Sequence, residues 1–353
     1  MANILDYLQT AVRANAADLF LIAGKEVCVK GTDGISSLSD HRLMPNETEE
    51  LVRQIYKLAN RELPDQLTCW DDDFALSVPH MARFRINVFQ QRGSLAAVIR
   101  VVHFGIPDWQ KMGLTPEILK AAEKTRGLVL VAGPAGSGKS TTLACIVDAI
   151  NRTRSAHIVT IEDPIEYLHR NNKSIVSQRE LNMDTASYVT ALRASLRQAP
   201  DVILVGEMRD PDTIQIAMTA AETGHLVIST LHTVGAVNTV NRIIDVFPPA
   251  QQQQIRVQLA QELKTVISQQ LLPVADGNGR VPAFEILNLN NAIRTMIRDS
   301  RIHQIDAVVQ TGASEGMIAM DESILRLYKA GKITRETALR FAMNVDVMAK
   351  KLG

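Results

Sequence analysis

The sequence predicts an α/β protein in which a small α+β domain is followed by a larger domain built on a mainly parallel sheet. In the second part of the chain, short apolar runs alternate with segments of helical periodicity, the order expected of parallel strands joined by helices. One apolar run, 128–132, leads directly into a glycine-rich turn and then into a helical pattern. The first part carries runs in which polar and apolar residues alternate, which indicates half-buried strands.

Composition places the chain among ordinary globular proteins. Its 353 residues exceed what one core usually holds, and its 38 basic and 38 acidic residues give a formal net charge of zero. This balance gives no indication of nucleic acid as a partner, and no apolar run approaches the length of a membrane-spanning helix. The widely spaced Cys28, Cys69 and Cys145 support neither a disulfide framework nor a zinc site. With no leader segment evident, we expect a protein of the reducing cytoplasm.

Periodicity also predicts the order of elements along the chain. A helix, two short strands, a second helix and three alternating strands make up the first domain. The segment 104–113 breaks every pattern, and we expect it to be a linker to a second domain that begins at Leu114. The expected helices of the first domain lie near 4–12 and 47–60 and its strands at 18–23, 27–30, 73–78, 82–90 and 94–102, and the strands of the second domain lie at 128–132, 157–162, 202–205 and 226–229.

Four arginines lie on or beside two of the strands expected in the first domain. Arg83 and Arg85 are two residues apart and should share one face of a strand, while Phe84 and Ile86 face the other way. One interpretation is a solvated sheet face. The other is a set of guanidinium groups for a nucleotide held by a neighbouring subunit, because arginine offers phosphate a planar, bidentate fork. The remaining two arginines are Arg92 and Arg100.

The turn after 128–132 has the pattern of a phosphate-binding loop. Its glycines allow backbone conformations without a Cβ penalty, and the start of the following helix adds partial positive charge. Lys139 would contact the β- and γ-phosphates, and the Ser140 hydroxyl would coordinate Mg²⁺. A tight strand-to-helix turn with an incidental lysine is the alternative. The nine residues are Gly133, Pro134, Ala135, Gly136, Ser137, Gly138, Lys139, Ser140 and Thr141.

Carboxylates crowd the end of the strand expected at 157–162, where parallel sheets bind ligands. Glu162, Asp163 and Glu166 could hold Mg²⁺ through water and polarise an attacking water molecule. They would lie beside the phosphate loop if the two strands are neighbours. An acidic turn capped by Pro164 is the alternative.

A second carboxylate follows the buried run 202–205. Glu207 is placed to orient water in line with a γ-phosphorus, as hydrolysis of a nucleoside triphosphate requires. In many such enzymes an aspartate precedes this glutamate, and here Gly206 takes that place. Metal contact should therefore come from elsewhere, and the group at Glu162 is the candidate.

Two histidines bracket the strand expected at 226–229. His232 lies at the C-terminal, catalytic end and could donate to a γ-phosphate. His225 lies at the opposite end, where structural support or a subunit contact is the more natural role. We expect structural roles for the remaining histidines, His41, His80, His103, His157, His169 and His303.

Four motifs in this order resemble those of the secretion and type IV pilus ATPases, and the resemblance is nearest to their PilT-type retraction branch. The Walker A motif lies at 133–141, the Asp box at 161–166, the Walker B motif at 205–210 and the His box at 223–233. The resemblance spans nearly the whole chain. Four ordered motifs make coincidence negligible.

The resemblance implies a hexameric ring that hydrolyses ATP with Mg²⁺ at subunit interfaces and powers pilus retraction, the basis of twitching motility. It implies a PAS-like domain at 1–103, the linker at 104–113, and a RecA-like domain at 114–353 that ends in helices from about 290. The implied partners are further copies of the chain, an inner-membrane platform protein of the PilC type and a paralogous pilus ATPase, without nucleic acid. The implied place is the inner face of the cytoplasmic membrane.

The resemblance also assigns roles to single residues. Glu207 resembles the Walker B glutamate, and arginines of the first domain reach the nucleotide in this family. The implied catalytic residues are Glu207, Glu162, Glu166, His232, Arg83, Arg85 and Arg92. The implied nucleotide-binding residues are the nine of the loop with Asp163, Arg209 and His225, while Ser140, Glu162 and Asp163 would hold Mg²⁺, the two acids through water.

Three further features bear on the branch of the family. Segment 292–299 resembles a signature linked to retraction, although a plain amphipathic helix explains its spacing equally well. Segment 270–285 is short and has no cysteine, whereas assembly-type relatives usually carry a four-cysteine zinc insert there. Segment 196–201 resembles the accessory PilU branch more than PilT, and 18–30 lacks the histidine and paired prolines usual in the family.

Other functions stay open at this point. Within the family, the chain could be a PilU-like accessory ATPase or a pilus or secretion assembly ATPase. Outside it, a nucleotide-gated scaffold with negligible turnover would use the same loop. A DNA-translocating ring is disfavoured by the neutral charge and the few aromatic residues.

Overall fold

The computed structural model describes residues 3–31, 34–63, 71–102, 105–277 and 279–353. Cys69, His103 and Phe104 lie outside the described residues. The chain divides into two compact units, one of Met1–Gly105 with Glu166–Leu168 and the other of Ile106–Ile165 with His169–Gly353. Within the described ranges, no helix combines the length and the apolar character needed to cross a membrane.

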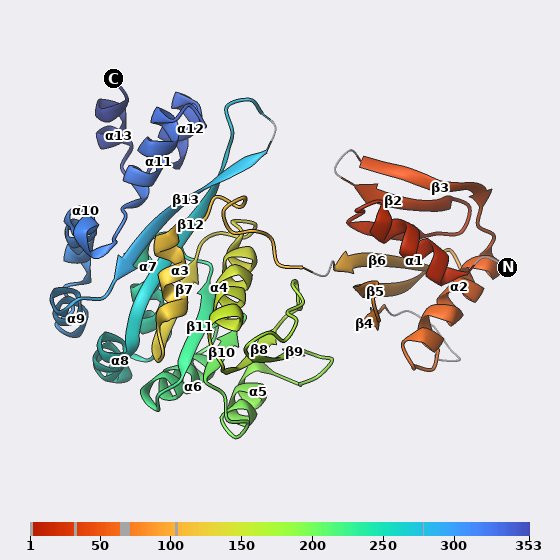
Figure 1. Ribbon diagram of the computed structural model, residues 1–353, viewed down its shortest axis with the longest axis horizontal. Helices are drawn as coiled ribbons and strands as arrows, with labels where there is room; N and C mark the ends of the chain where they lie inside the picture. Colours follow the sequence, from red (N-terminus) through yellow and green to blue (C-terminus); the bar gives the residue numbers. More distant parts are fainter. Residues whose placement is uncertain (1–2, 32–33, 64–70, 103–104, 278) are drawn as a thin grey trace. The chain divides into compact units, whose positions relative to one another are not determined.

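The first unit is an antiparallel sheet with two helices, in the strand order β3–β2–β1–β6–β5–β4 (Figure 1). Leu8 of α1 and Tyr56 of α2 pack in one core with Phe84 of β5. The predicted α+β class is confirmed, and its PAS-like character stays a prediction. The elements are α1 (Ile4–Arg13), β1 (Asp18–Leu21), β2 (Glu26–Gly31), β3 (Gly34–Arg42), α2 (Pro45–Leu58), β4 (Asp72–Val78), β5 (Ala82–Gln91) and β6 (Ser94–Val102).

Strand β5 gives this sheet two different faces. Phe84 is fully buried, whereas Arg83 is half-buried and Arg85 is exposed, as the alternation along the strand predicts. On the arginine face, Arg85 lies opposite Arg100 of β6. Arg100 in turn donates to Asp18 Oδ1 at 2.9 Å. The sheet therefore presents guanidinium groups on the face turned away from its core.

The second unit is built on a seven-stranded sheet in the order β13–β12–β7–β11–β10–β8–β9. Only β13 runs antiparallel to its neighbour, so the predicted parallel sheet is confirmed. Strands buried on both faces read as continuous apolar runs, which is why the sequence shows them clearly. The strands are β7 (Gly127–Ala132), β8 (His157–Glu162), β9 (Ile175–Glu180), β10 (Val202–Val205), β11 (Leu226–Leu231), β12 (Leu263–Pro273) and β13 (Arg280–Asn288).

Helices cover both faces of this sheet (Figure 1). Leu128 and Leu130 of β7 contribute to a core with helices α5 to α10, while Val129 and Val131 contribute to a second core with α3 and α4. Helices α11 to α13 pack on the ends of β12 and β13. The helices are α3 (Pro116–Leu119), α4 (Lys139–Thr153), α5 (Tyr188–Ser195), α6 (Pro211–Glu222), α7 (Ala236–Asp245), α8 (Pro249–Glu262), α9 (Asn291–Arg298), α10 (Ile305–Thr311), α11 (Met320–Lys329), α12 (Arg335–Phe341) and α13 (Val345–Leu352).

Several elements differ from the sequence-based expectation. The strands β3, β9, β12 and β13 were not expected; β3 and β9 lie at sheet edges, where few side chains are buried, and both contain many polar residues. The strand expected at 226–229 extends to Leu231. Part of the segment expected as a linker belongs to the second unit, since Ile106 and Trp109 pack against its core.

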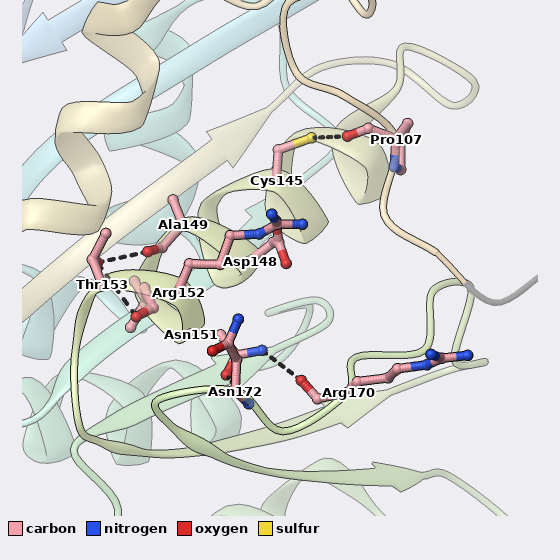
Figure 2. A network of polar contacts seen from close by, with 10 residues as sticks. Pro107, Cys145, Asp148, Ala149, Asn151, Arg152, Thr153, Arg170 and Asn172 are labelled. Carbon is pink, nitrogen blue, oxygen red and sulfur yellow. Dashed lines mark hydrogen bonds and ion pairs between the residues drawn. The ribbon is translucent and has the colours of Figure 1, made fainter.

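Helix α4 forms hydrogen bonds with two other segments of the second unit, one at Pro107 and one at 170–172 (Figure 2). Asn151 is 2% exposed; its Nδ2 donates to the Arg170 carbonyl at 2.7 Å, and its Oδ1 accepts from the Asn172 N–H at 3.1 Å. Cys145 Sγ donates to the Pro107 carbonyl at 3.5 Å. The helix that begins in the glycine-rich turn therefore also fixes the chain between β8 and β9.

Replacing Asn151 should destabilise the second unit. Asn151→Ala leaves two backbone groups without their partner, so we expect the free energy of unfolding in urea to fall by about 2 kcal/mol. Arg152→Ala is the matched control on the same helix, because it removes only the exposed ion pair to Asp148 and should cost less than ~0.5 kcal/mol. Equal losses for the two variants would contradict the structural role of Asn151.

Candidate active site

The glycine-rich turn connects β7 to α4 in the way the sequence predicts. Gly133 and Gly138 have φ of +152° and +87°, backbone conformations that residues with a Cβ rarely adopt, and Gly138 is the N-cap residue of α4. Lys139 is 9% exposed, and its Nζ donates to the carbonyls of Gly133 at 2.8 Å and Pro134 at 3.0 Å. The lysine thus lies across the loop, with its ammonium inside the concavity expected to receive phosphate.

The other motifs lie near this loop, at the carboxyl ends of the parallel strands. β11 lies directly beside β7, followed by β10 and then β8, and all four run parallel. His232 follows β11, Glu207 follows β10 and Glu162 ends β8. The condition that β8 neighbours the strand of the phosphate loop is therefore not met, because two strands separate them. The histidine and Glu207 lie between the loop and the acids of β8.

A chain of polar contacts joins the loop to Glu207. His232 Nδ1 lies 3.4 Å from Lys139 Nζ, and His232 Nε2 lies 3.1 Å from Glu207 Oε1. Arg209 donates to the other carboxylate oxygen of Glu207 at 2.7 Å. Burial opposes ionisation of Glu207, but the Arg209 hydrogen bond and the adjacent His232 imidazole outweigh it and lower the pKa of this carboxyl. Glu207 is therefore ionised and able to accept a proton.

The acids at the end of β8 are held differently from one another. Glu162 Oε1 accepts from Thr160 Oγ1 at 2.6 Å and from Gln178 Nε2 at 3.1 Å, which fixes its carboxylate. Asp163 is exposed. Together these two residues offer one oriented and one accessible carboxylate near the ends of β8 and β10.

The donor set suits a Mg²⁺ ion that arrives with phosphate. Among the described residues, no group of three His, Cys, Asp or Glu side chains could hold a metal by itself. Mg²⁺ commonly takes one or two protein oxygens and fills its other positions with phosphate and water. Ser140 in the first turn of α4 and the acids of β8 can supply such oxygens.

Tyr188, at the start of α5, was missed by sequence reasoning. Its hydroxyl fills the space beside Gly206, where an added Cβ would lie 2.8 Å from that oxygen and 3.2 Å from the Ile161 carbonyl. Burial raises the pKa of the Tyr188 hydroxyl, and the carboxylates of Asp163, Glu207 and Glu162 add to the rise, so it stays protonated. An aspartate before Glu207 would collide with this tyrosine, which explains the glycine.

The remaining predicted residues divide into those near the loop and those in the other unit. Arg209 pairs with Glu207, as described. His225 lies before β11 at the end remote from the loop, where its Nδ1 is 2.9 Å from the Ala220 carbonyl oxygen, and its role in nucleotide binding stays a prediction. Glu166 is grouped with the first unit, which also contains Arg83, Arg85 and Arg92 in the β5–β6 hairpin, and their roles stay predictions.

A phosphate loop with its lysine, an ionised glutamate two strands away and a histidine between them define a P-loop nucleoside triphosphatase. The glutamate is Glu207, at the carboxyl end of a parallel strand, where such sheets bind their ligands. Comparison with known proteins identifies the family.

A family model described as type II/IV secretion system protein matches residues 2–343. The chain is 50% identical over 277 residues to a twitching motility protein of Neisseria gonorrhoeae, covering 78% of this chain and 74% of that protein. It is 41% identical over 337 residues to the type IV pilus retraction ATPase PilT of Pseudomonas aeruginosa, covering 95% and 97%. A crystal structure of the pilus retraction motor PilT with bound ADP matches with a TM-score of 0.88 at 43% identity, over 99% of this chain and 100% of that chain.

The chain belongs to the type II/IV secretion system protein family, and within it to the PilT-type retraction ATPases. It is therefore an ATPase, and it binds an adenine nucleotide.

The contact between Gly206 and Tyr188 gives a testable rescue. Gly206→Ala should lower the free energy of unfolding by about 1–3 kcal/mol and reduce ATPase activity, because the new methyl group overlaps the tyrosine hydroxyl. Adding Tyr188→Phe removes the overlapping atom and should recover at least half of the stability. Urea denaturation of both single variants and of the double variant measures this. A double variant as unstable as Gly206→Ala would show that the hydroxyl is not the obstacle.

Proposed function

We propose that this protein is a hexameric motor that hydrolyses ATP with Mg²⁺ and powers retraction of a type IV pilus. The observation that carries the proposal is its likeness over nearly the full length to a protein named as the retraction ATPase. In the proposed ring, Arg83, Arg85 and Arg92, which lie in the first unit, would be supplied to the nucleotide of a neighbouring subunit.

The residues at the carboxyl ends of the central strands each have a role in this proposal. Lys139 moves from the loop carbonyls to the β- and γ-phosphates, and Glu207 orients the attacking water in line with the γ-phosphorus. His232, which lies between them, donates to the γ-phosphate. When bound, Mg²⁺ neutralises charge on the phosphate oxygens, and Ser140, Glu162 and Asp163 would hold it.

Mechanical work would come from the difference between nucleotide states. ATP binding closes the gap between the second unit of one subunit and the first unit of its neighbour, and hydrolysis opens it. The motion would pass to a platform protein of the PilC type in the inner membrane, which places the ring in the cytoplasm at the inner face of that membrane. Absence of cysteine from the β12–β13 hairpin residues that the structure describes favours retraction over assembly.

The first test separates a motor from a nucleotide-gated scaffold. Wild type should release phosphate from ATP, EDTA should abolish this, and added Mg²⁺ should restore it. Glu207→Gln should lower kcat by about 10²–10³-fold with little change in KM, while Lys139→Ala should lose nucleotide binding as well. Phosphate release by wild type no faster than by Lys139→Ala would favour the scaffold.

The pKa of Glu207 gives a prediction about pH. Arg209→Gln removes the hydrogen bond that lowers this pKa, so Glu207 becomes protonated at higher pH and the acid limb of the kcat/KM profile moves upward. Arg326→Gln is the matched control, because it removes an exposed arginine–glutamate pair elsewhere in the unit. An acid limb at the same pH in Arg209→Gln and wild type would argue against Glu207 as the group that must be ionised.

A cellular test separates primary from accessory retraction. In a strain that lacks both its main and its accessory retraction ATPases, this chain alone should restore twitching motility if it is the main motor. Restoration only in the presence of the main ATPase would assign it the PilU-like accessory role.

A further inference from the structure

Strand β12 carries a buried glutamine beside the phosphate loop. β12 pairs with β7 in parallel, and Ser268 lies opposite Ala132, so Gln269 follows at the level of the loop. The residue is 2% exposed, and its neighbours along the strand, Ser268 and Gln270, are also buried polar residues. Burial of an amide is unfavourable unless both of its ends are hydrogen-bonded. We therefore ask which hydrogen bonds Gln269 makes that an apolar side chain could not make.

Both ends of the Gln269 side-chain amide form hydrogen bonds, one with the loop and one with the first turn of α4. Its Nε2 donates to the Ser137 carbonyl, and its Oε1 accepts from Thr142 Oγ1 at 2.8 Å. The orientation of the amide is fixed by chemistry, because a carbonyl oxygen can only accept and must face the NH₂ group. Ser137 and Thr142 are each 2% exposed, so water cannot easily replace either bond.

The two partners lie on opposite sides of Lys139. Ser137 belongs to the loop itself, and Thr142 belongs to the first turn of α4. The backbone of Gln269 also touches the start of the loop, since a Cβ added to Gly133 would lie 2.4 Å from the Gln269 carbonyl oxygen. One residue of the neighbouring strand thus contacts the loop at its beginning, in its middle and just after its end.

We propose that Gln269 is a positioning residue for the nucleotide: it holds the loop around Lys139 in the shape that receives phosphate. Three glycines give the loop large conformational freedom when it is unbound, and fixing that freedom in advance strengthens binding. Gln269 acts through Ser137 and Thr142, and its amide is used by those two partners. This inference rests on the proposed binding of ATP at the loop.

The test compares two neighbouring glutamines. Gln269→Leu should weaken ADP binding, measured by isothermal titration, roughly tenfold, and should raise the KM for ATP more than it lowers kcat. Gln270→Leu is the matched control; this side chain reaches the Phe341 carbonyl instead, at 3.4 Å, and its replacement should leave ADP binding unchanged. Thr142→Val should weaken binding less than Gln269→Leu, and the double variant should be no worse than Gln269→Leu because both remove the same bond.

A second variant tests the need for a donor without removing volume. In Gln269→Glu an ionised carboxylate would face the Ser137 carbonyl, whereas a protonated one can donate to it. Burial raises the pKa of such a carboxyl, so the weakening of ADP binding relative to wild type should shrink as the pH is lowered. A purely structural role would leave this ratio independent of pH.

The outcomes separate the inference from the proposed function. If wild type and Gln270→Leu bind no nucleotide, the proposed ATP site fails. If both bind ADP and Gln269→Leu binds it equally tightly, only the role of Gln269 fails. If Gln269→Leu does not fold, two other variants decide the question. The inference is overturned if the ADP affinity of Gln269→Glu relative to wild type does not change with pH and Thr142→Val binds ADP as tightly as wild type.

Discussion

Parallel pairing of buried strands is the constraint on which the active site depends. β7, β11, β10 and β8 are held side by side, so the residues that follow them arrive at one edge of the sheet. Both faces of these strands are packed against helices, and a slip of one residue would turn every side chain toward the wrong layer. The core therefore sets the spacing between Lys139, His232 and Glu207.

Polar groups at this edge are already paired with protein atoms. Lys139 lies on two loop carbonyls, Glu162 accepts from Thr160, and Glu207 is held by Arg209 and His232. A triphosphate would exchange these partners for its own oxygens instead of entering an unpaired site. Lys139, His232 and Glu207 connect the ends of β7, β11 and β10. A change of partner at the phosphate can therefore shift the side chains at the other two strand ends.

The sequence predicted the parts of this arrangement that depend on local pattern. The apolar runs of the central strands, the glycine-rich turn and the alternation that separates Arg85 from Phe84 are all local, and the structure has them. The strand order is not local, so the separation of β8 from β7 could not be read from the chain. Tyr188 and Gln269 belong to no sequence motif. The Tyr188 hydroxyl lies against Gly206, and Gln269 lies beside the loop because β12 pairs with β7.

A crystal structure with a non-hydrolysable ATP analogue and Mg²⁺ tests the central claim most directly. The account predicts the β- and γ-phosphates within the turn at 133–141, with Lys139 Nζ moved from the carbonyls of Gly133 and Pro134 to the phosphate oxygens. An analogue bound elsewhere, with Lys139 still on those two carbonyls at saturating ligand, would contradict it.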